Sequence, residues 1–202
     1  PFEVPRIAYR DIARGSDERT MIATVIPAGI PCLDTLNVVE PLTVELSNVS
    51  NLPTDLKQIQ QNKYNPEELL ALTGILNSLP FDYLIRNRIG DGVHLSNYIV
   101  ENARAPVIRD SPSVQNELAQ LVAKLNCYGD EFSEFRTEVG VSEDDLIREK
   151  EQRAEVMVEI DCLVFDTYGI TQPEFVDEVI QSFRGSGSGR VIDRRYLRSV
   201  RD

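Results

Sequence analysis

The 202-residue chain carries a net charge of -12, and 42% of its residues are hydrophobic. That apolar content supports a hydrophobic core and excludes a disordered chain, and no apolar run approaches the roughly 18 residues that a membrane helix requires. Three cysteines far apart in the sequence indicate neither a disulfide framework nor a zinc cluster, so the expected location is the reducing cytoplasm.

The charge is distributed unevenly along the chain. Residues 1–110 hold 10 Lys and Arg against 14 Asp and Glu, residues 111–183 hold 5 against 17, and residues 184–202 hold 6 against 2. The acidic excess therefore belongs to one segment. The N-terminus lacks an initiator methionine and the layout of a signal peptide, so we expect a piece of a longer protein.

The first part of the chain predicts extended structure. Residues 4–14 alternate loosely, residues 19–26 are rich in β-branched side chains, and the polar residues 15–18 predict a turn between two strands. Residues 35–47 indicate further extended structure, which Pro41 limits to an edge or interrupts. A polar loop is expected from residue 47 to residue 65.

Helical spacing begins after Asn65. The sequence Asn65-Pro66-Glu67-Glu68 predicts a helix start, because Asn caps, Pro suits the first turn and acids favour the positive end of a helix. Apolar spacing continues to Leu79, and Pro80 is expected to interrupt it. Short helical segments are predicted from residue 81 and over residues 95–103, followed by an extended exit at residues 105–107.

Residues 111–183 predict an acidic helical subdomain. We expect helices over residues 113–128 and from residue 142 to about residue 168, ended by Gly129 and Gly169. A last helix is predicted after the capping-box-like segment 171–174, with Phe175 among its apolar residues. The predicted fold is α+β: a small, mostly antiparallel N-terminal sheet with helices in residues 1–110, the helical subdomain at 111–183, and a flexible basic tail at 184–202.

The motifs of several enzyme classes are missing from the sequence. Amino-methyltransferases need a glycine-rich cofactor loop after a strand and an Asn/Asp-Pro-Pro-aromatic motif, and neither occurs here. Asp144, Asp145, Glu149 and Lys150 are residue types that a metal-dependent nuclease uses, but their helical spacing favours a solvated helix face. We therefore predict no catalytic residue and no metal ligand.

Three segments carry motifs in a fixed order. The first is RIAYRDIARGSDERTMIATVIP at residues 6–27, and the second is LNSLPFDYLIRNRIGDGVHLSNYIVENARAPV at residues 76–107. The third, residues 153–183, includes Tyr168-Gly169-Ile170-Thr171 and Glu174-Phe175. Together they resemble the C-terminal specificity region of large N6-adenine DNA methyltransferases, namely type IIG and IIL restriction–modification enzymes, the TaqI-like specificity domain group and phage-defence methylases.

The resemblance implies a noncatalytic DNA target-recognition module. The parent protein would be a methyltransferase dependent on S-adenosylmethionine, possessing an upstream catalytic domain into which the target adenine flips. This segment would need no cofactor of its own. Its implied partners are double-stranded DNA and the upstream methyltransferase domain, with no membrane, and whether the parent carries a nuclease is left open.

The candidate DNA contacts are side chains that can read bases or hold phosphates: Arg10, Arg14, Arg19, Arg86, Arg88, His94 and Asn97. Each has an alternative role. The first three arginines could be solvated strand ends, or Arg19 could pair with Asp17 or Asp11. One of Arg86 and Arg88 could face Asp82 or Asp91. Asn97 could make a local bond near a helix start.

Two further functions remain open. The acidic helices of residues 111–183 could dock a basic partner or another subunit, which would make the chain a protein–protein interaction module of a defence complex. An enzyme with an unrecognised site is the third possibility.

Overall fold

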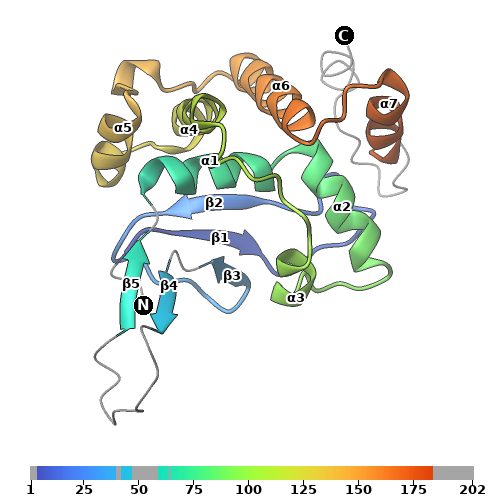
Figure 1. The fold of residues 1–202 in the computed structure, drawn as a ribbon, viewed down its shortest axis with the longest axis horizontal. Coiled ribbons are helices and arrows are strands. Elements are labelled where there is room, and N and C mark those ends of the chain that lie inside the picture. Colours follow the sequence, from blue (N-terminus) through green and yellow to red (C-terminus); the bar gives the residue numbers. More distant parts are fainter. Residues whose placement is uncertain (1–3, 40–41, 47–58, 64, 184–202) are drawn as a thin grey trace.

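A three-stranded antiparallel sheet begins the fold (Figure 1). The computed structural model describes residues 4–39, 42–46, 59–63 and 65–183. Strands β1 (Arg6–Arg10), β2 (Ala23–Ile26) and β3 (Leu36–Val39) are arranged in the order β2-β1-β3. The predicted strands are confirmed, but β1 and β2 are joined by a loop from residue 11 to residue 22 and not by a four-residue turn.

A second pair of strands stands apart from this sheet. Strand β4 (Leu42–Leu46) pairs antiparallel with β5 (Ile59–Lys63). Strands β3 and β4 flank the predicted break at Pro41, which itself lies outside the described residues. The prediction of a polar loop over residues 47–65 was wrong for β5, because its sequence IQQNK has no apolar alternation and its hydrogen bonds come from pairing with β4.

Three helices follow the strands, and two of them begin at side-chain caps. Helix α1 (Pro66–Leu76) begins as predicted, with the backbone N–H of Glu68 donating to Asn65 at 2.7 Å. Helix α2 (Leu79–Ile89) has Ser78 as its N-cap. Pro80 therefore lies in the first turn of α2, where its missing N–H costs nothing, and does not interrupt a longer helix. Helix α3 (Asn97–Glu101) is short.

The acidic subdomain contains four helices and does not match the prediction at every boundary. Helices α4 (Pro112–Asn126) and α7 (Pro173–Ser182) are confirmed, whereas α5 (Ser133–Val139) was not predicted. Helix α6 (Lys150–Thr167) begins eight residues later than expected. The reason is a capping box between Ser142 and Asp145 that closes a single 3-10 turn, after which Leu146 is extended.

Helix α1 lies between the sheet and the layer formed by α4 and α6 (Figure 1). One hydrophobic cluster runs through all three layers, from Ile7 in the sheet through Ile75 in α1 to Val122 and Ile160. A Cβ on Gly74 would lie 2.9 Å from the Val122 side chain, so glycine permits the close approach of α1 and α4. The predicted boundary at residue 110 falls in a loop and does not coincide with a break in this core.

A smaller cluster attaches α7 to the rest of the fold. Leu79, Phe165, Val179, Ile180 and Phe183 form it, from α2, α6 and the end of α7. Phe175, one of the apolar residues of the predicted helix, is 56% exposed, because it lies in the first turn of α7, away from this cluster. A buried hydrogen bond also joins α2 to α6 here: the backbone N–H of Leu79 donates at 2.7 Å to the carboxylate of Asp161.

Candidate functional site

A buried carboxylate organises the predicted arginines. The side chain of Asp82, on α2, is fully buried. Arg19 Nε lies 3.2 Å from one carboxylate oxygen and Arg86 Nε 3.8 Å from the other. The backbone N–H of Thr20 donates to both oxygens at 3.1 Å. Burial raises the pKa of Asp82, while the two guanidinium groups and the backbone donors oppose that shift.

Phe183 covers the two arginines from the end of α7. The Arg86 Cζ lies 3.7 Å from the centroid of the Phe183 ring, and the Arg19 Cζ lies 5.8 Å from it. Arg86 also donates to the carbonyl oxygens of Ser182 at 3.0 Å and Asp17 at 3.2 Å. Its side chain is only 5% exposed, and burial is the main cause that lowers its pKa. Arg86 thus joins α2, α7 and the loop between β1 and β2.

Arg10 is also held by the fold. Its guanidinium donates to the carbonyl oxygens of Thr20 and Arg19 and lies 3.1 Å from Asp17 Oδ2. Arg19 donates in turn to the carbonyl oxygen of Asn77. The guanidinium groups of Arg10, Arg19 and Arg86 thus close the loop between β1 and β2. Their side chains are 28%, 15% and 5% exposed, so Arg19 and Arg86 in particular serve the fold, and a DNA contact of these residues stays a prediction. The predicted alternative of Arg86 facing Asp82 is the observed arrangement.

Two loop segments meet beside this network. The backbone N–H of Ala13 donates to the Val93 carbonyl oxygen at 3.1 Å, and the N–H of Leu95 donates to the Asp11 carbonyl oxygen at 2.6 Å. Ile12 and His94 form an isolated antiparallel bridge between these two contacts. The Cβ that Gly15 lacks would lie 3.1 Å from the Arg86 carbonyl oxygen, so glycine permits the close approach of the first segment to α2.

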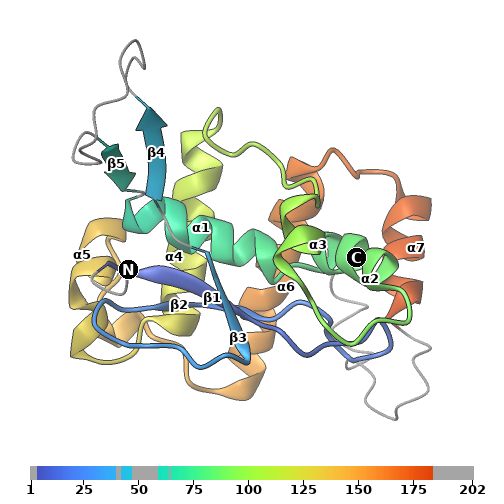
Figure 2. The ribbon, with the colours of Figure 1, turned by 90° about the horizontal axis from the view of Figure 1, so that it is seen from below.

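The remaining predicted residues lie on or next to these two segments. Arg14 belongs to the first and His94 to the second, whereas Arg88 lies in the last turn of α2 and Asn97 begins α3, and all four are exposed. In Figure 1 α3 lies on the sheet side of α1 and α4 on the other side, and in Figure 2, seen from below, α4 passes behind α1. Four of the seven predicted residues are therefore exposed on or next to these segments. Arg88 also lies near the end of α6, since it acts on the pKa of Tyr168, and its helix α2 meets α7 through the hydrogen bond of Tyr83 to Glu178 at 2.7 Å.

His94 is oriented by residues that sequence reasoning did not select. Its Nδ1 lies 2.7 Å from Asp11 Oδ2, and Asn37 Nδ2 donates to Asp11 Oδ1 at 3.2 Å. The His94 side chain is 66% exposed and that of Asp11 is 22% exposed. The hydrogen bonds from His94 and Asn37 lower the pKa of Asp11. Sequence reasoning missed the role of Asp11, which directly follows a strand. The fold places its carboxylate next to the only histidine of the chain.

Asn97 is bonded to the sheet and not to the start of α3. The buried Tyr9 hydroxyl donates to Asn97 Oδ1, and Ser96 occupies the N-cap position without a side-chain cap bond. Burial raises the pKa of Tyr9 to about 12, with smaller contributions from Glu101 and Asp11. Because the amide oxygen of Asn97 is engaged by Tyr9, an external partner would meet its Nδ2 donor.

The helical layer presents a surface of the opposite character. Its helices expose the following carboxylates: Glu117, Glu134, Glu138, Glu151, Glu155, Glu159, Asp166, Glu174 and Glu178. Two of its arginines serve internal roles, since Arg136 donates to the Cys127 and Gly129 carbonyl oxygens, and Arg153 to that of Leu125. The acidic surface expected from the sequence is therefore present.

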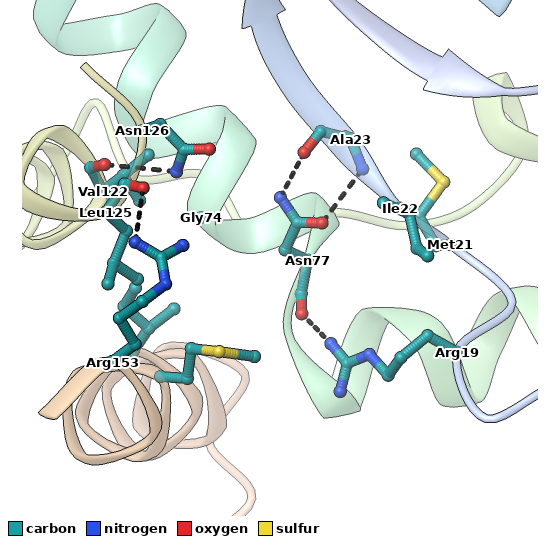
Figure 3. A pocket seen from close by; sticks show the side chains of 12 residues that line it. Arg19, Met21, Ile22, Ala23, Gly74, Asn77, Val122, Leu125, Asn126 and Arg153 are labelled. Atoms are coloured by element: carbon teal, nitrogen blue, oxygen red, sulfur yellow. Dashed lines mark hydrogen bonds between the residues drawn. The ribbon is translucent and has the colours of Figure 1, made fainter. Parts of the chain in front are cut away.

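A pocket of about 290 Å³ lies between β2, α1, α4 and α6 (Figure 3). Its walls are mainly apolar, and its polar groups serve the surrounding backbone. Asn77 accepts from the Ala23 N–H at 2.9 Å and donates to the Ala23 carbonyl oxygen at 2.8 Å, which closes the outer edge of β2. Arg153 reaches the Leu125 carbonyl oxygen across the opposite wall. These contacts account for the polar side chains that would otherwise suggest a ligand site.

Within the described residues, no group of three or more His, Cys, Asp or Glu side chains is arranged to hold a metal ion. None of the helices described combines the length and the apolar character that crossing a membrane requires. Comparisons of the chain with protein-family models, curated proteins and solved structures found no match.

Proposed function

We propose that this chain is the DNA target-recognition module of an N6-adenine DNA methyltransferase that depends on S-adenosylmethionine, with the catalytic domain upstream in the parent protein. The parent would be a cytoplasmic restriction–modification or phage-defence enzyme. One observation carries the proposal. The segments 6–27 and 76–107, on which the family resemblance rests, meet through backbone hydrogen bonds and an isolated bridge, and Arg14, Arg88, His94 and Asn97 on these segments are all exposed.

The distribution of charge supports an approach of DNA from the sheet side. Phosphates are attracted by Arg14 and Arg88, whereas the carboxylates of α4 and α6 would repel them. Helix α1 lies between the sheet and the layer of α4 and α6. The acidic layer would therefore disfavour the wrong orientation on the duplex, and the net charge of -12 would not prevent binding through the opposite side.

The test is a binding titration with duplex DNA against salt concentration. Arg14→Ala and Arg88→Ala should each weaken binding and reduce the salt slope by about 1 for a lost phosphate contact. Lys150→Ala, an exposed cation on the acidic side, is the control and should leave both quantities unchanged. Arg10 and Arg86 are unsuitable test positions because their replacement would damage the fold.

The proposal fails if the wild-type chain, joined to its upstream domain, binds no duplex even at low salt. A second check is the coding sequence that precedes Pro1 in the parent gene. It should contain a glycine-rich cofactor loop after a predicted strand, followed by an Asn/Asp-Pro-Pro-aromatic motif.

A second candidate is a protein–protein interaction module, which the acidic helical surface favours. In that case, changing Glu151, Glu155 and Glu159 to Lys on α6 should abolish salt-sensitive binding of a lysine-rich probe peptide. The variants at Arg14 and Arg88 should then bind the peptide normally. DNA binding that survives the α6 changes would favour the target-recognition function.

A further inference from the structure

The Asp11 carboxylate is held in place by three segments of the chain. Its backbone N–H donates to the Thr35 carbonyl oxygen at 3.0 Å, and its own carbonyl oxygen accepts from Leu95 at 2.6 Å. One side-chain oxygen accepts from Asn37, and the other faces His94 Nδ1 at 2.7 Å. Asn37 Nδ2 also donates to the Leu95 carbonyl oxygen at 2.9 Å, so both partners of the carboxylate are fixed by the same loop.

This arrangement determines where the imidazole carries its proton. An ionised carboxylate is an acceptor only, and the two hydrogen bonds that it receives keep the pKa of Asp11 below its usual range. The proton of the contact between Asp11 and His94 therefore belongs to Nδ1. In a neutral imidazole the second nitrogen, Nε2, then carries a lone pair and no proton.

We infer that Asp11 holds His94 in the Nδ1–H tautomer and thereby presents Nε2 as a hydrogen-bond acceptor on the exposed surface. The matching ligand must bring an N–H or O–H donor. Phosphate oxygens are acceptors and do not meet this requirement, so the role of His94 differs from that of Arg14 and Arg88. Asp11 is a positioning residue that acts through His94.

The identity of the ligand rests on the proposed function. In the major groove the donors on base edges are the N6 amino group of adenine and the N4 amino group of cytosine. A neutral His94 would accept from one of them, while Asn97 contributes its Nδ2 donor nearby. The geometry thus separates one base-reading residue from the phosphate contacts at Arg14 and Arg88.

The tautomer can be measured directly, because His94 is the only histidine in the chain. In the intact chain labelled with ¹⁵N-histidine, two-bond ¹H–¹⁵N correlation spectra at pH 8 should show a protonated Nδ1 and an unprotonated Nε2. A wild-type spectrum of the Nε2–H form would overturn the inference, whatever the chain binds.

The substitution Asp11→Asn should reverse the tautomer. Asn37 donates to Oδ1, so the amide oxygen of the new side chain keeps that partner and its NH₂ group faces His94 Nδ1. The ring must then accept at Nδ1 and carry its proton on Nε2. If the variant does not fold, Asn37→Ala is the second variant, and its looser carboxylate should give a mixture of the two tautomers. An unchanged tautomer in whichever of the two variants folds would contradict a positioning role for Asp11.

The consequence for binding is tested by selection from a library of duplexes with a random central segment. At one position, Asp11→Asn should shift the preference from adenine or cytosine toward guanine or thymine by about tenfold, because a donor replaces an acceptor. Arg14→Ala should lower the yield without a shift at any position. A preference unchanged by Asp11→Asn would contradict the base-reading role, whereas a library in which wild type enriches nothing would contradict the proposed function and leave the tautomer result intact.

Discussion

Arg86 and Arg88 are separated by one residue, but one side chain is buried and the other is exposed. The Arg86 side chain is 5% exposed, lies against the Phe183 ring and pairs with Asp82, whereas Arg88 is exposed on the other side of α2. The same contrast divides Arg19 from Arg14 in the loop between β1 and β2. The arginines therefore divide into a buried region, Arg19 and Arg86, which stabilises the fold, and an exposed region, Arg14 and Arg88, which is accessible to a partner.

The comparison teaches that the position of a guanidinium on its element decides its role. Asp82 and Arg86 are four residues apart on α2 and so lie on one face, but Arg88 is turned away from that face. Arg86 is buried because the end of α7 places the Phe183 ring and the Ser182 carbonyl oxygen against its guanidinium group. Experiments on the buried region should therefore change stability, and those on the exposed region should change binding.

The largest effect is expected from Asp82→Asn. The substitution leaves Arg19 and Arg86 without their shared negative charge in a buried site, which should cost about 3–5 kcal/mol of unfolding free energy. Urea denaturation measures this free energy. The control is Asp91→Asn, an exposed position, whose unfolding free energy should stay within about 0.5 kcal/mol of wild type. A loss below about 1 kcal/mol would show that the buried network contributes little and would remove the basis of the comparison.

The matched pair Arg86→Met and Arg88→Met tests the contrast directly. Arg86→Met should lose about 2–3 kcal/mol, because Asp82 keeps only Arg19 and its backbone donors. Arg88→Met should remain within about 0.5 kcal/mol of wild type, since its side chain is exposed. Equal losses in the two variants, measured by the same denaturation experiment, would contradict the division into two regions.

Asn77→Ala should come next, with a loss of about 2 kcal/mol. The change removes both hydrogen bonds to the Ala23 backbone and leaves that edge of β2 unpaired. Asn87→Ala is a suitable control, because Asn87 is exposed and its side chain bonds to Tyr83 in the preceding turn of α2 and not to the sheet. Faster amide exchange around β2 in the first variant, and not in the second, would locate the effect.

The smallest effect is a pH dependence at Asp11. Its pKa is lowered in the folded chain by the hydrogen bonds from His94 and Asn37, so its contribution to stability is present above the pKa of the unfolded chain. That contribution is lost as the pH falls through the lower pKa of the folded chain. The difference in stability between wild type and Asp11→Ala should therefore narrow on acidification, and a difference that widened would indicate the opposite shift.

Local patterns in the sequence were sufficient for much of the fold. The strands, the cap at Asn65 and the helix end at Gly169 follow from alternation, side-chain capping and a positive φ, which depend on neighbouring residues. The helix end predicted at Gly129 was wrong, because α4 already ends at Asn126 with Cys127 as its C-cap and Gly129 precedes a separate 3-10 turn. Strand β5 and the late start of α6 were missed because a distant partner and a competing capping box decide them. The DNA-recognition function is a proposal that rests on the motif order and on the exposed residues of segments 6–27 and 76–107.

The sequence by itself determined that arginines are concentrated around a loop and a helix end, and that an acidic helical segment follows. Only the tertiary structure decided which guanidinium groups face water. The contacts that decide it join residues 62 and 96 positions apart, Thr20 with Asp82 and Arg86 with Ser182. A guanidinium carries the same charge wherever it lies, so its role depends on the groups that the fold packs around it.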